Sequence, residues 1–414
     1  MKAQLRIESL VHGGDGLARL DGRVIFVRGG APGDVVEADV QGTGRFEHAR
    51  ALRVVQPGST RVAAPCPIVA DCGGCPLQHV DYAAQLAAKT ALTVDALERI
   101  GGFGAGTYEL MPIAESPRRL RYRRWARLHR APRGTWGFKG EQGVVPVGEC
   151  LLFDEPLQRL ADLVRGTELP GVTDLGLDTS AAGAGALYLR TAGTPSRSLQ
   201  RRAGELLGIV QGIAIGSNVL GDPVLIDEYA GFRLRSRPDA FSQANRSMVP
   251  MLQDAALAGL GPAANGRVLE LFCGTGTLTL PLLARAESVV AVESSPLALQ
   301  LLRRSADEMP AAPGKLRLAA GDAAQVVRGV EGDFDAALLD PPRTGSADAA
   351  VALAARGVPR IVYVSCDAPT LARDAKLLAD RAYHLACAHP LDLFPQTAHY
   401  EVVATFIRRG ASSS

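Results

Sequence analysis

The residues best placed to do chemistry lie between Tyr363 and Thr370, where Cys366 is flanked by a serine and an aspartate. The apolar run 360–364 predicts a strand before this cysteine, and Pro369–Ala379 predicts a helix after it. A thiol at that junction lies at the carboxyl edge of a sheet, where open α/β folds bind ligands. A lone cysteine is more often a small buried hydrophobic residue, so a nucleophilic role depends on its neighbours.

A second pattern, RVLELFCGTGT at 267–277, predicts a buried strand and a tight glycine turn into a helix at Thr277–Ala286. Gly274 and Thr277 are the candidate ligand contacts of this turn. The next strand, 288–292, ends in Glu293, and an acidic residue there hydrogen-bonds ribose hydroxyls. The third glycine of a dinucleotide fingerprint is missing. A loop without it suits S-adenosylmethionine (AdoMet), which has no pyrophosphate.

The glycine turn followed by a strand that ends in Glu293 resembles the class I methyltransferases. That resemblance implies an adenine-side acid at Asp322, after the strand 316–319. Another strand, 334–339, leads to Asp340. Strands that alternate with helices in this way predict an α/β fold, with a parallel sheet covered on both faces.

The turn Asp340-Pro341-Pro342-Arg343 follows this last strand. Methyltransferases that act on exocyclic amines carry a related motif, in which an aromatic residue stacks on the base. Here Arg343 replaces the aromatic residue, and Cys366 follows the next strand. The combination favours attack on a ring carbon rather than on an amine.

Three cysteines, Cys66, Cys72 and Cys75, lie in a Pro/Gly-rich loop with the spacing Cys-x5-Cys-x2-Cys. This spacing favours a shared metal or cluster over three structural cysteines. Cys150 is the nearest candidate in sequence for a fourth ligand. On spacing alone zinc is the commoner occupant. The seven cysteines are odd in number, which disfavours a disulfide framework in a chain that looks cytosolic.

Two regions suggest contact with nucleic acid. Short apolar runs and Gly-rich turns in residues 1–58 predict a five-stranded barrel of the OB type, a fold that often binds nucleic acid. The run Arg118–Arg130 contains seven arginines, with Tyr122 and Trp125 interleaved. As a strand, it would present on one face Arg119, Arg121, Arg123, Trp125 and Arg127. Such a face suits RNA phosphates and bases, although arginines also protect a solvated edge strand from aggregation.

Length and composition are typical of a multi-domain soluble protein. At 414 residues and 47% hydrophobic content, the chain can form two or three domains with substantial cores. Its apolar runs are shorter than the roughly 20 residues that span a bilayer, and residues 1–6 are not a signal-peptide core. We therefore expect a cytoplasmic, monomeric protein without a membrane partner.

A helix is predicted at Ala83–Ile100.

Taken together, the motifs DPPRTG, YVSCDAPTLARD and DLFPQTAHYE, with FSQAN and LELFCGTG upstream, resemble the RNA uridine-C5 (m5U) methyltransferase family. The N-terminal glycine pattern resembles a TRAM domain, and the cysteine pattern resembles the [4Fe–4S] motif of the 23S rRNA enzymes. The resemblance covers essentially the whole chain. It implies a TRAM barrel at 1–58, a central α+β iron–sulfur domain with an RNA-binding strand at 59–235, and a class I AdoMet-dependent domain at 236–414.

The resemblance also implies the site residues. Cys366 would add to carbon 6 of uracil, AdoMet would supply the methyl group for carbon 5, and Glu401 would remove the proton from carbon 5. Without the resemblance, Glu401 would be taken for a surface carboxylate that begins a strand. Further donor-binding positions fall on Gln243, Phe272, Glu293 and Asp340, and the cluster ligands on Cys66, Cys72, Cys75 and Cys150.

The chain departs from the family at Asp367, usually Asn, and at Tyr400, usually Val. An Asp367 side chain that pointed into the site would raise the pKa of Cys366 and slow its attack. The preferred substrate is 23S rRNA, with a tRNA T-loop uridine as the alternative. A rival hypothesis is a non-catalytic iron–sulfur RNA-binding protein with a degenerate methyltransferase fold.

Overall fold

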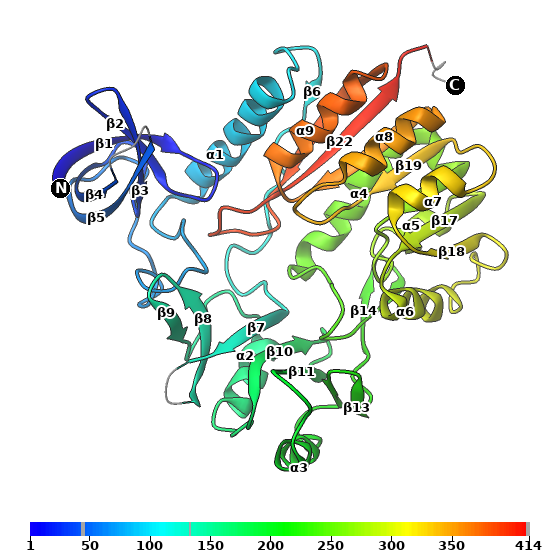
Figure 1. Ribbon diagram of the computed structural model, residues 1–414, viewed down its shortest axis with the longest axis horizontal. Coiled ribbons are helices and arrows are strands. Elements are labelled where there is room, and N and C mark those ends of the chain that lie inside the picture. Colours follow the sequence, from blue (N-terminus) through cyan, green and yellow to red (C-terminus); the bar gives the residue numbers. More distant parts are fainter. Residues whose placement is uncertain (43–45, 132–133, 411–414) are drawn as a thin grey trace.

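A closed barrel forms the N-terminal end of the molecule in the computed structural model, which describes residues 1–42, 46–131 and 134–410 (Figure 1). Its strands are β1 (Lys2–Leu10), β2 (Gly16–Leu20), β3 (Arg23–Arg28), β4 (Val35–Gln41) and β5 (Phe46–Gln56). They close in the order β1-β2-β3-β5-β4. Inward-facing side chains alternate along each strand, as Val36, Ala38 and Val40 do on β4. The predicted five-stranded barrel is confirmed.

The central part is a seven-stranded sheet with the order β13-β12-β11-β10-β7-β8-β9. Its strands are β7 (Trp125–Arg130), β8 (Trp136–Gly140), β9 (Gly143–Pro146), β10 (Val172–Thr179), β11 (Gly185–Thr191), β12 (Gly212–Ile215) and β13 (Asn218–Gly221). Helices α2 (Glu155–Val164) and α3 (Arg197–Leu206) contribute to its core. A hairpin of β14 (Leu225–Tyr229) and β15 (Phe232–Ser236) then leads to the C-terminal part.

The arginine-rich run is not the continuous strand that its sequence predicts, because β7 begins only at Trp125. Arg121 has a left-handed backbone with φ of 56°, which an extended strand does not accommodate. Its side chain pairs with Glu149, and the Arg119 guanidinium lies 4.3 Å from the centre of the Tyr82 ring. The residues expected on one strand face are therefore divided between a turn and β7.

Another arginine of this run, Arg124, is fully buried rather than presented to solvent. Its guanidinium contacts carboxylate oxygens of Asp178 and Asp227, each at 2.8 Å. Burial disfavours its charged form, but the two carboxylates outweigh burial and raise the pKa of Arg124. Since Asp178 belongs to β10 and Asp227 to β14, Arg124 ties the central sheet to the hairpin that follows it.

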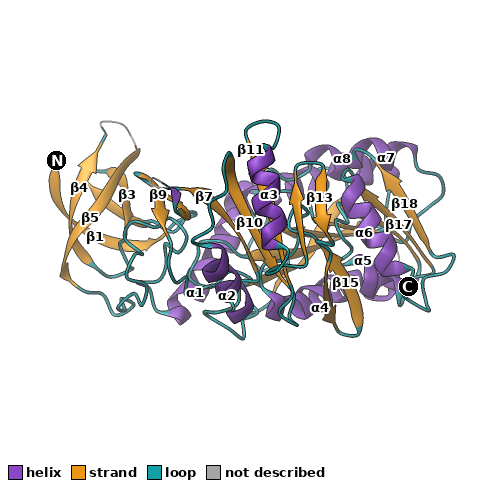
Figure 2. Cartoon of the chain, turned by 90° about the horizontal axis from the view of Figure 1, so that it is seen from below, coloured by secondary structure: helices purple, strands orange, loops and turns teal. Residues whose placement is uncertain are grey.

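The C-terminal part contains an eight-stranded sheet with the order β18-β17-β16-β19-β20-β22-β21-β6 (Figures 1 and 2). Its strands are β6 (Glu109–Leu110), β16 (Arg267–Leu271), β17 (Ser288–Glu293), β18 (Leu316–Ala320), β19 (Ala336–Leu339), β20 (Arg360–Ser365), β21 (Tyr383–Leu391) and β22 (Glu401–Arg408). The accompanying helices are α4 (Val249–Leu260), α5 (Thr279–Leu283), α6 (Pro296–Ala306), α7 (Ala323–Gly329), α8 (Ala347–Arg356) and α9 (Ala368–Ala379).

The prediction of a purely parallel sheet is wrong at one strand. The five strands from β16 to β20 pair in parallel, but β22 runs antiparallel to both β20 and β21. Strand β21 was not foreseen. A strand that is buried on both faces is apolar along its whole length. Its sequence therefore does not indicate whether it runs parallel or antiparallel to its neighbours.

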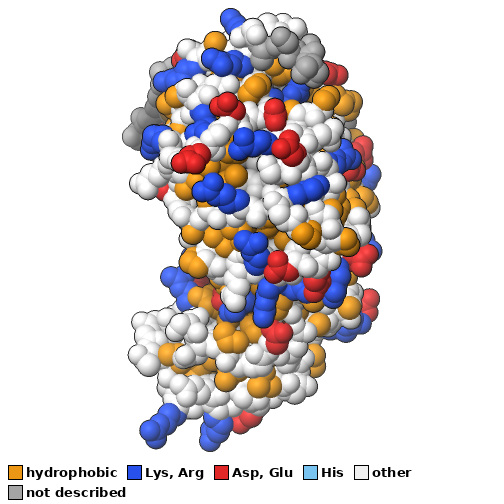
Figure 3. All heavy atoms as spheres, turned by 90° about the vertical axis from the view of Figure 1, so that its right-hand side faces the viewer, with side chains coloured by type: hydrophobic (Ala, Val, Ile, Leu, Met, Phe, Trp, Pro, Cys, Tyr) orange, Lys and Arg blue, Asp and Glu red, His pale blue; other side chains and the backbone are white. Residues whose placement is uncertain are grey.

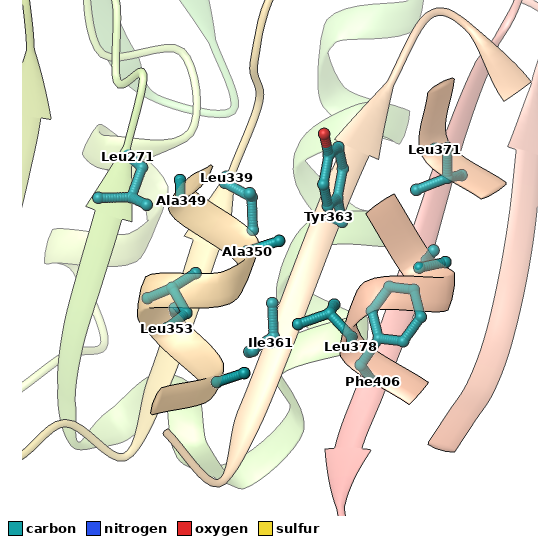
Figure 4. Packing of buried hydrophobic residues seen from close by; sticks show 14 of the residues in the cluster. Leu271, Leu339, Ala349, Ala350, Leu353, Ile361, Tyr363, Leu371, Leu378 and Phe406 are labelled. Carbon is teal, nitrogen blue, oxygen red and sulfur yellow. The ribbon is translucent and has the colours of Figure 1, made fainter. Parts of the chain in front are cut away.

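Helices cover both faces of this sheet, and strand residues alternate between the two cores. On β19, Ala337 and Leu339 belong to the core beneath α7, α8 and α9, whereas Ala336 and Leu338 belong to the core beneath α4, α5 and α6. Figure 4 shows the first core, in which Leu339 lies beside side chains of α8. Burial on both faces fixes the positions of the strand ends that carry the site.

A helix from early in the chain completes this C-terminal part. The predicted helix Ala83–Ile100 is observed as α1 (Tyr82–Asp95) followed by a π-helical turn, Ala96–Ile100. Leu97 of that turn belongs to the core beneath α9, and β6 pairs in parallel with β21. These residues thus pack on the eight-stranded sheet although they precede most of its strands by more than a hundred positions.

Helix α1 also holds the loop that leads to β22. The Lys89 ammonium lies 2.6 Å from a carboxylate oxygen of Asp392, and both side chains are almost fully buried. Burial lowers the pKa of Lys89, and the Asp392 charge opposes that shift. One turn away on α1, the Gln85 side chain donates to the Gln396 side chain and accepts from its backbone N–H, both at 3.0 Å.

Within the described residues, none of the helices is both long enough and apolar enough to cross a bilayer. On the face shown in Figure 3, basic and acidic side chains are interspersed.

Lys89→Met should lower the midpoint of guanidinium unfolding, because it leaves the buried Asp392 carboxylate without its cation. Removal of one partner of a buried pair costs about 3–5 kcal/mol. Lys89→Met/Asp392→Leu should lose less stability than the single variant, because no charge is stranded. Circular dichroism measures both transitions, and a double variant that is less stable than the single one would contradict this role.

Candidate active site

Cys366 follows β20 directly and is held in a short turn before α9. Ser365 Oγ donates to the backbone oxygen of Asp367 at 3.1 Å and accepts from its N–H at 3.2 Å. Asp367 then begins α9, where its Oδ1 accepts from the N–H of Thr370 at 2.9 Å. The thiol is therefore partly exposed on a turn that hydrogen bonds fix on both sides.

Glu401 lies beside this turn because β22 runs antiparallel to β20. The register pairs Ser365 with Val402, so the residues that flank this pair, Cys366 and Glu401, lie at the same edge of the sheet. Glu401 is only 5% exposed. Burial raises its pKa well above the ordinary value, the Asp340 charge adds to the rise, and the Arg343 charge opposes it.

The electrostatic environment of Cys366 disfavours its thiolate in the free protein. Burial raises the pKa of the thiol to about 12, and the charges of Glu401 and Asp340 contribute. Arg343 acts in the other direction through its charge and a hydrogen bond to the thiol. Arg343 therefore lies within reach of the thiol, and the sequence pattern marked this position only by the absence of an aromatic residue.

Two further carboxyl groups lie near the ends of neighbouring strands, and of these Glu270 is buried and Asp340 is half-buried. Burial raises the pKa of Asp340 to about 7. Burial also raises the pKa of Glu270 to about 8, with Thr279 lowering it and Asp340 raising it. Glu270 was not among the predicted residues, although a glutamate inside the apolar run Leu269–Leu271 is an unusual feature that marks it.

The predicted glycine turn is observed after β16. Phe272 and Gly274 have left-handed backbones, with φ of 61° and 53°. The N–H of Gly274 donates to a carboxylate oxygen of Glu293 at 3.1 Å, and the other oxygen accepts from the N–H of Ser295 at 2.8 Å. A side chain on Gly274 would meet nothing within 4 Å, whereas one on Gly276 would meet Leu302 at 2.5 Å. The turn thus has one open side and one closely packed side.

Helix α5 is shorter than the predicted segment Thr277–Ala286, because the turn continues through Leu278 before the helix begins. The carbonyl of Thr277 accepts from the Gln253 side chain of α4 at 2.8 Å. Asp322, expected on the adenine side, follows β18 and accepts from the N–H of Gln325 at the start of α7 at 2.9 Å. The structure brings Glu293 and Asp322 to the ends of adjacent strands.

Gln243 is buried in the segment before α4. Two residues later, the Asn245 amide donates to the carbonyl of Leu393 at 3.0 Å and to Ser116 Oγ at 3.1 Å. Its oxygen accepts from the N–H of Ser247 in the helical turn that leads into α4. The Gln243 segment is thus attached to the loop that leads to Glu401.

The two residues that depart from the family pattern do not point at the thiol. The Asp367 side chain caps α9, and its Oδ2 lies 3.1 Å from Nε2 of His12 in the barrel. The hydrogen bond from His12 lowers the pKa of Asp367 to about 2. Tyr400 is buried next to Thr93 of α1, and burial raises its pKa to about 12.

The four cysteines of the predicted cluster line one pocket between the loop 66–75 and residue 150, although the fourth lies on a different segment. The Gln78 side chain accepts from the N–H of Cys66 at 3.1 Å. Burial raises the pKa of Cys75 to about 12 and also raises that of Cys150. In the described residues, no three His, Cys, Asp or Glu side chains are close enough to hold a single metal ion.

Comparison with known proteins identifies the family. The sequence model of the tRNA (uracil-5-)-methyltransferase family matches residues 211–409, and that of the TRAM domain matches residues 4–46. The chain is 35% identical to the 23S rRNA (uracil(1939)-C(5))-methyltransferase RlmD of Pseudomonas entomophila, over 98% of this chain and 93% of that protein. The chain belongs to the RNA uracil-C5 methyltransferase family. RlmD of Alkalilimnicola ehrlichii is 36% identical, with 98% and 96% covered.

A solved structure agrees with this family assignment at the level of the fold. The tRNA (uracil-54, C5)-methyltransferase of Pyrococcus abyssi, in complex with S-adenosyl-L-homocysteine, superposes with a TM-score of 0.75 at 23% identity. The match covers 98% of this chain and 99% of that one. The class I methyltransferase fold and the N-terminal TRAM barrel are therefore shown, and the methyl donor of the family is AdoMet.

The residues at the edge of the sheet fit this donor. AdoMet carries a sulfonium and an ammonium group. The carboxyl groups of Glu293, Asp322 and Asp340 lie at the ends of β17, β18 and β19, the strands on the two sides of β16. Ribose hydroxyls donate hydrogen bonds to such carboxylates. The open side of Gly274 leaves room for a ligand above the turn.

AdoMet binding should strengthen as the pH rises from about 6 to about 8, because Asp340, with a pKa of about 7, must lose its proton to attract a cation. The raised pKa means that the attraction is lost as pH falls, by at most about tenfold per pH unit. Isothermal titration calorimetry measures the affinity. Asp340→Asn should flatten the profile, and S-adenosylhomocysteine, which lacks the sulfonium charge, should show a weaker dependence. A wild-type slope in Asp340→Asn would exclude this carboxyl group as the cause.

Proposed function

We propose that this chain methylates carbon 5 of one uridine in 23S rRNA, with Cys366 as the nucleophile and Glu401 as the base. The observation that carries the proposal is the register of β20 and β22, which pairs Ser365 with Val402. The thiol and the carboxyl group accordingly flank the same pair, at the sheet edge where the donor turn also lies. Few other functions require a thiol, a carboxylate and a bound methyl donor at the same edge of a sheet.

The chemistry accounts for both side chains. Carbon 5 of uracil is too weak a nucleophile to take a methyl group from a sulfonium. When the Cys366 thiolate adds to carbon 6, the electron pair of the double bond moves toward carbon 5 and forms an enolate. AdoMet, when bound, supplies the methyl group that this carbon accepts. The Glu401 carboxylate then removes the original proton from carbon 5, the double bond forms again, and the carbon–sulfur bond breaks to return the thiolate.

Both reacting groups must be ionised, and burial opposes this in the free protein. Arg343 favours the charged form of each, since its charge lowers the pKa of both Cys366 and Glu401. We therefore assign Arg343 to stabilisation of the thiolate. A preorganised cation in a site from which water is excluded acts more strongly than one in solvent.

The choice of 23S rRNA as the substrate rests on the names of similar proteins rather than on a contact with RNA in the structure. The relatives that are 35% and 36% identical over nearly the whole chain are named as 23S rRNA uracil-C5 methyltransferases. The tRNA enzyme of Pyrococcus abyssi has the same fold at lower identity. A tRNA uridine is therefore the second candidate substrate.

We also propose that Cys66, Cys72, Cys75 and Cys150 bind a [4Fe–4S] cluster. Support comes from the pocket that all four line, because four thiolates complete the ligand set of such a cluster. Zinc is the alternative occupant, which the cysteine spacing alone favours. The cluster would have a structural or RNA-positioning role rather than a redox role, since the proposed reaction transfers no electrons.

This proposal divides the chain near residues 58 and 235 into an RNA-binding barrel, an iron–sulfur part and a methyltransferase part. The TRAM match at 4–46 supports the first division.

Incubation with AdoMet and RNA containing 5-fluorouridine should give a covalent protein–RNA adduct, because fluorine at carbon 5 cannot be removed as a proton. Denaturing electrophoresis with 23S rRNA and tRNA transcripts measures the adduct and identifies the preferred substrate. Cys366→Ala should form none. Glu401→Gln should accumulate an adduct even with ordinary uridine RNA, because proton removal is blocked after methyl transfer.

Two outcomes would overturn the proposal in different ways. A Cys366→Ala variant that still forms the adduct would exclude this thiol as the nucleophile. A wild-type protein that binds AdoMet but forms no adduct with either RNA would favour a non-catalytic RNA-binding protein. Adduct with tRNA but not with 23S rRNA would leave the chemistry intact and change the substrate.

Protein purified without oxygen should contain about four iron and four sulfide per chain, with the broad visible absorption of an iron–sulfur cluster. Cys75→Ser should lose most of the iron, whereas Cys387→Ser, a cysteine outside the pocket, should retain it. Metal analysis by mass spectrometry is the measurement. Stoichiometric zinc with no iron would contradict the cluster assignment.

A further inference from the structure

The loop between β1 and β2 of the barrel contacts the turn that carries Cys366. Nε2 of His12 lies 3.1 Å from Oδ2 of Asp367, although the two residues are 355 positions apart. Gly14 of the same loop is packed so closely that an added Cβ would lie 3.3 Å from Ala398. One barrel loop therefore contacts both the turn that carries Cys366 and the loop that leads to Glu401.

The direction of this hydrogen bond follows from the charge of Asp367. Its pKa is lowered to about 2, chiefly by the bond from His12, so the carboxyl group is ionised at neutral pH and can only accept. Nε2 of His12 must then be the donor. The other carboxylate oxygen accepts from the N–H of Thr370, and the two bonds together fix the side chain.

The position of this carboxylate bears directly on Cys366, which precedes it in the chain. Burial, Glu401 and Asp340 already raise the pKa of the thiol. A third carboxylate turned toward the thiol would disfavour the thiolate further. In the structure, the Asp367 carboxylate is instead directed at the barrel and at the N-terminus of α9.

We infer that His12 is a positioning residue for the nucleophile. Its imidazole holds the Asp367 carboxylate away from the Cys366 thiol and fixes the turn between β20 and α9. Because His12 belongs to the RNA-binding barrel, correct seating of the barrel becomes a condition for presentation of the thiol. The inference rests on the proposed nucleophilic role of Cys366 and assigns to the barrel a part in the chemical step, beyond RNA binding.

A double-mutant cycle on His12 and Asp367 tests the inference. The rate of adduct formation with 5-fluorouridine RNA is measured under single-turnover conditions, with RNA and AdoMet saturating, for wild type, His12→Ala, Asp367→Asn and the double variant. His12→Ala should slow the reaction about tenfold, a typical size for coupled neighbours. Addition of Asp367→Asn should restore at least half of the lost rate, because Asn caps a helix equally well without the charge.

His12→Gln serves as the conservative control, because its side-chain amide can still donate to the carboxylate. It should retain most of the wild-type rate. A second measurement needs neither RNA nor methyl transfer. The rate at which iodoacetamide alkylates Cys366, followed by mass spectrometry, should fall in His12→Ala and recover in the double variant.

Three results would overturn the inference. The effects of His12→Ala and Asp367→Asn on the rate could multiply, which would show no coupling between the two residues. His12→Ala could raise only the RNA concentration needed for half-saturation, which would make His12 an RNA contact. The alkylation rate could be the same in all four proteins. If instead Cys366→Ala still forms the adduct, the proposed function fails, and the alkylation measurement alone decides whether His12 acts on the turn.

Discussion

The antiparallel pairing of β22 with β20 is the constraint on which the active site depends. Strand β21 carries the chain to the ligand edge of the sheet, a loop of nine residues reverses it, and β22 begins there with Glu401. A β22 that ran parallel to β20 would begin at the far edge. The seven steps between its eight residues, at about 3.3 Å each, would then separate Glu401 from Cys366 by about 23 Å. The direction of one strand thus decides whether the proposed base and the proposed nucleophile can act on the same ring.

Several carboxyl groups lie at the same sheet edge. Their ionisation there costs free energy, which a bound cationic ligand offsets. Glu270 and Glu401 are buried there, Asp340 is half-buried, and desolvation raises the pKa of each. A carboxyl group without a cation avoids the penalty of a buried charge when it keeps its proton. The free site is therefore closer to neutral than its composition indicates. A cationic donor favours ionisation, so the charge that catalysis needs develops when the donor is present.

Short-range patterns predicted most of the catalytic sheet. The turn at Gly274, the acid at Glu293 and the cysteine at Cys366 each lie at the end of an apolar strand. The carboxyl ends of parallel strands lie at the same edge of a sheet, so the positions of these residues could be predicted. Features that depend on distant partners could not be read in this way. Arg124 resembles an RNA contact in sequence, and only Asp178 and Asp227, from other strands, make it a core residue.

The same limit applies to the direction of side chains. The sequence shows that Asp367 follows Cys366, but the orientation of its side chain is set by His12, 355 residues away. Likewise, the helix at α1 was predicted from its own periodicity, whereas its packing on the catalytic sheet depends on residues such as Asp392 that pair with it. Local residues define the elements, and long-range contacts decide what those elements do.

The pairing of β6 with β21 has a consequence for synthesis of the chain. Leu110 is made early, but its partner Ala388 leaves the ribosome much later. At about 5–20 residues per second the interval is on the order of half a minute. During that time the apolar surface around Leu97 has no sheet to cover it, which is a condition under which nascent chains aggregate. The cysteine pocket, whose last member is Cys150, is complete well before that interval ends.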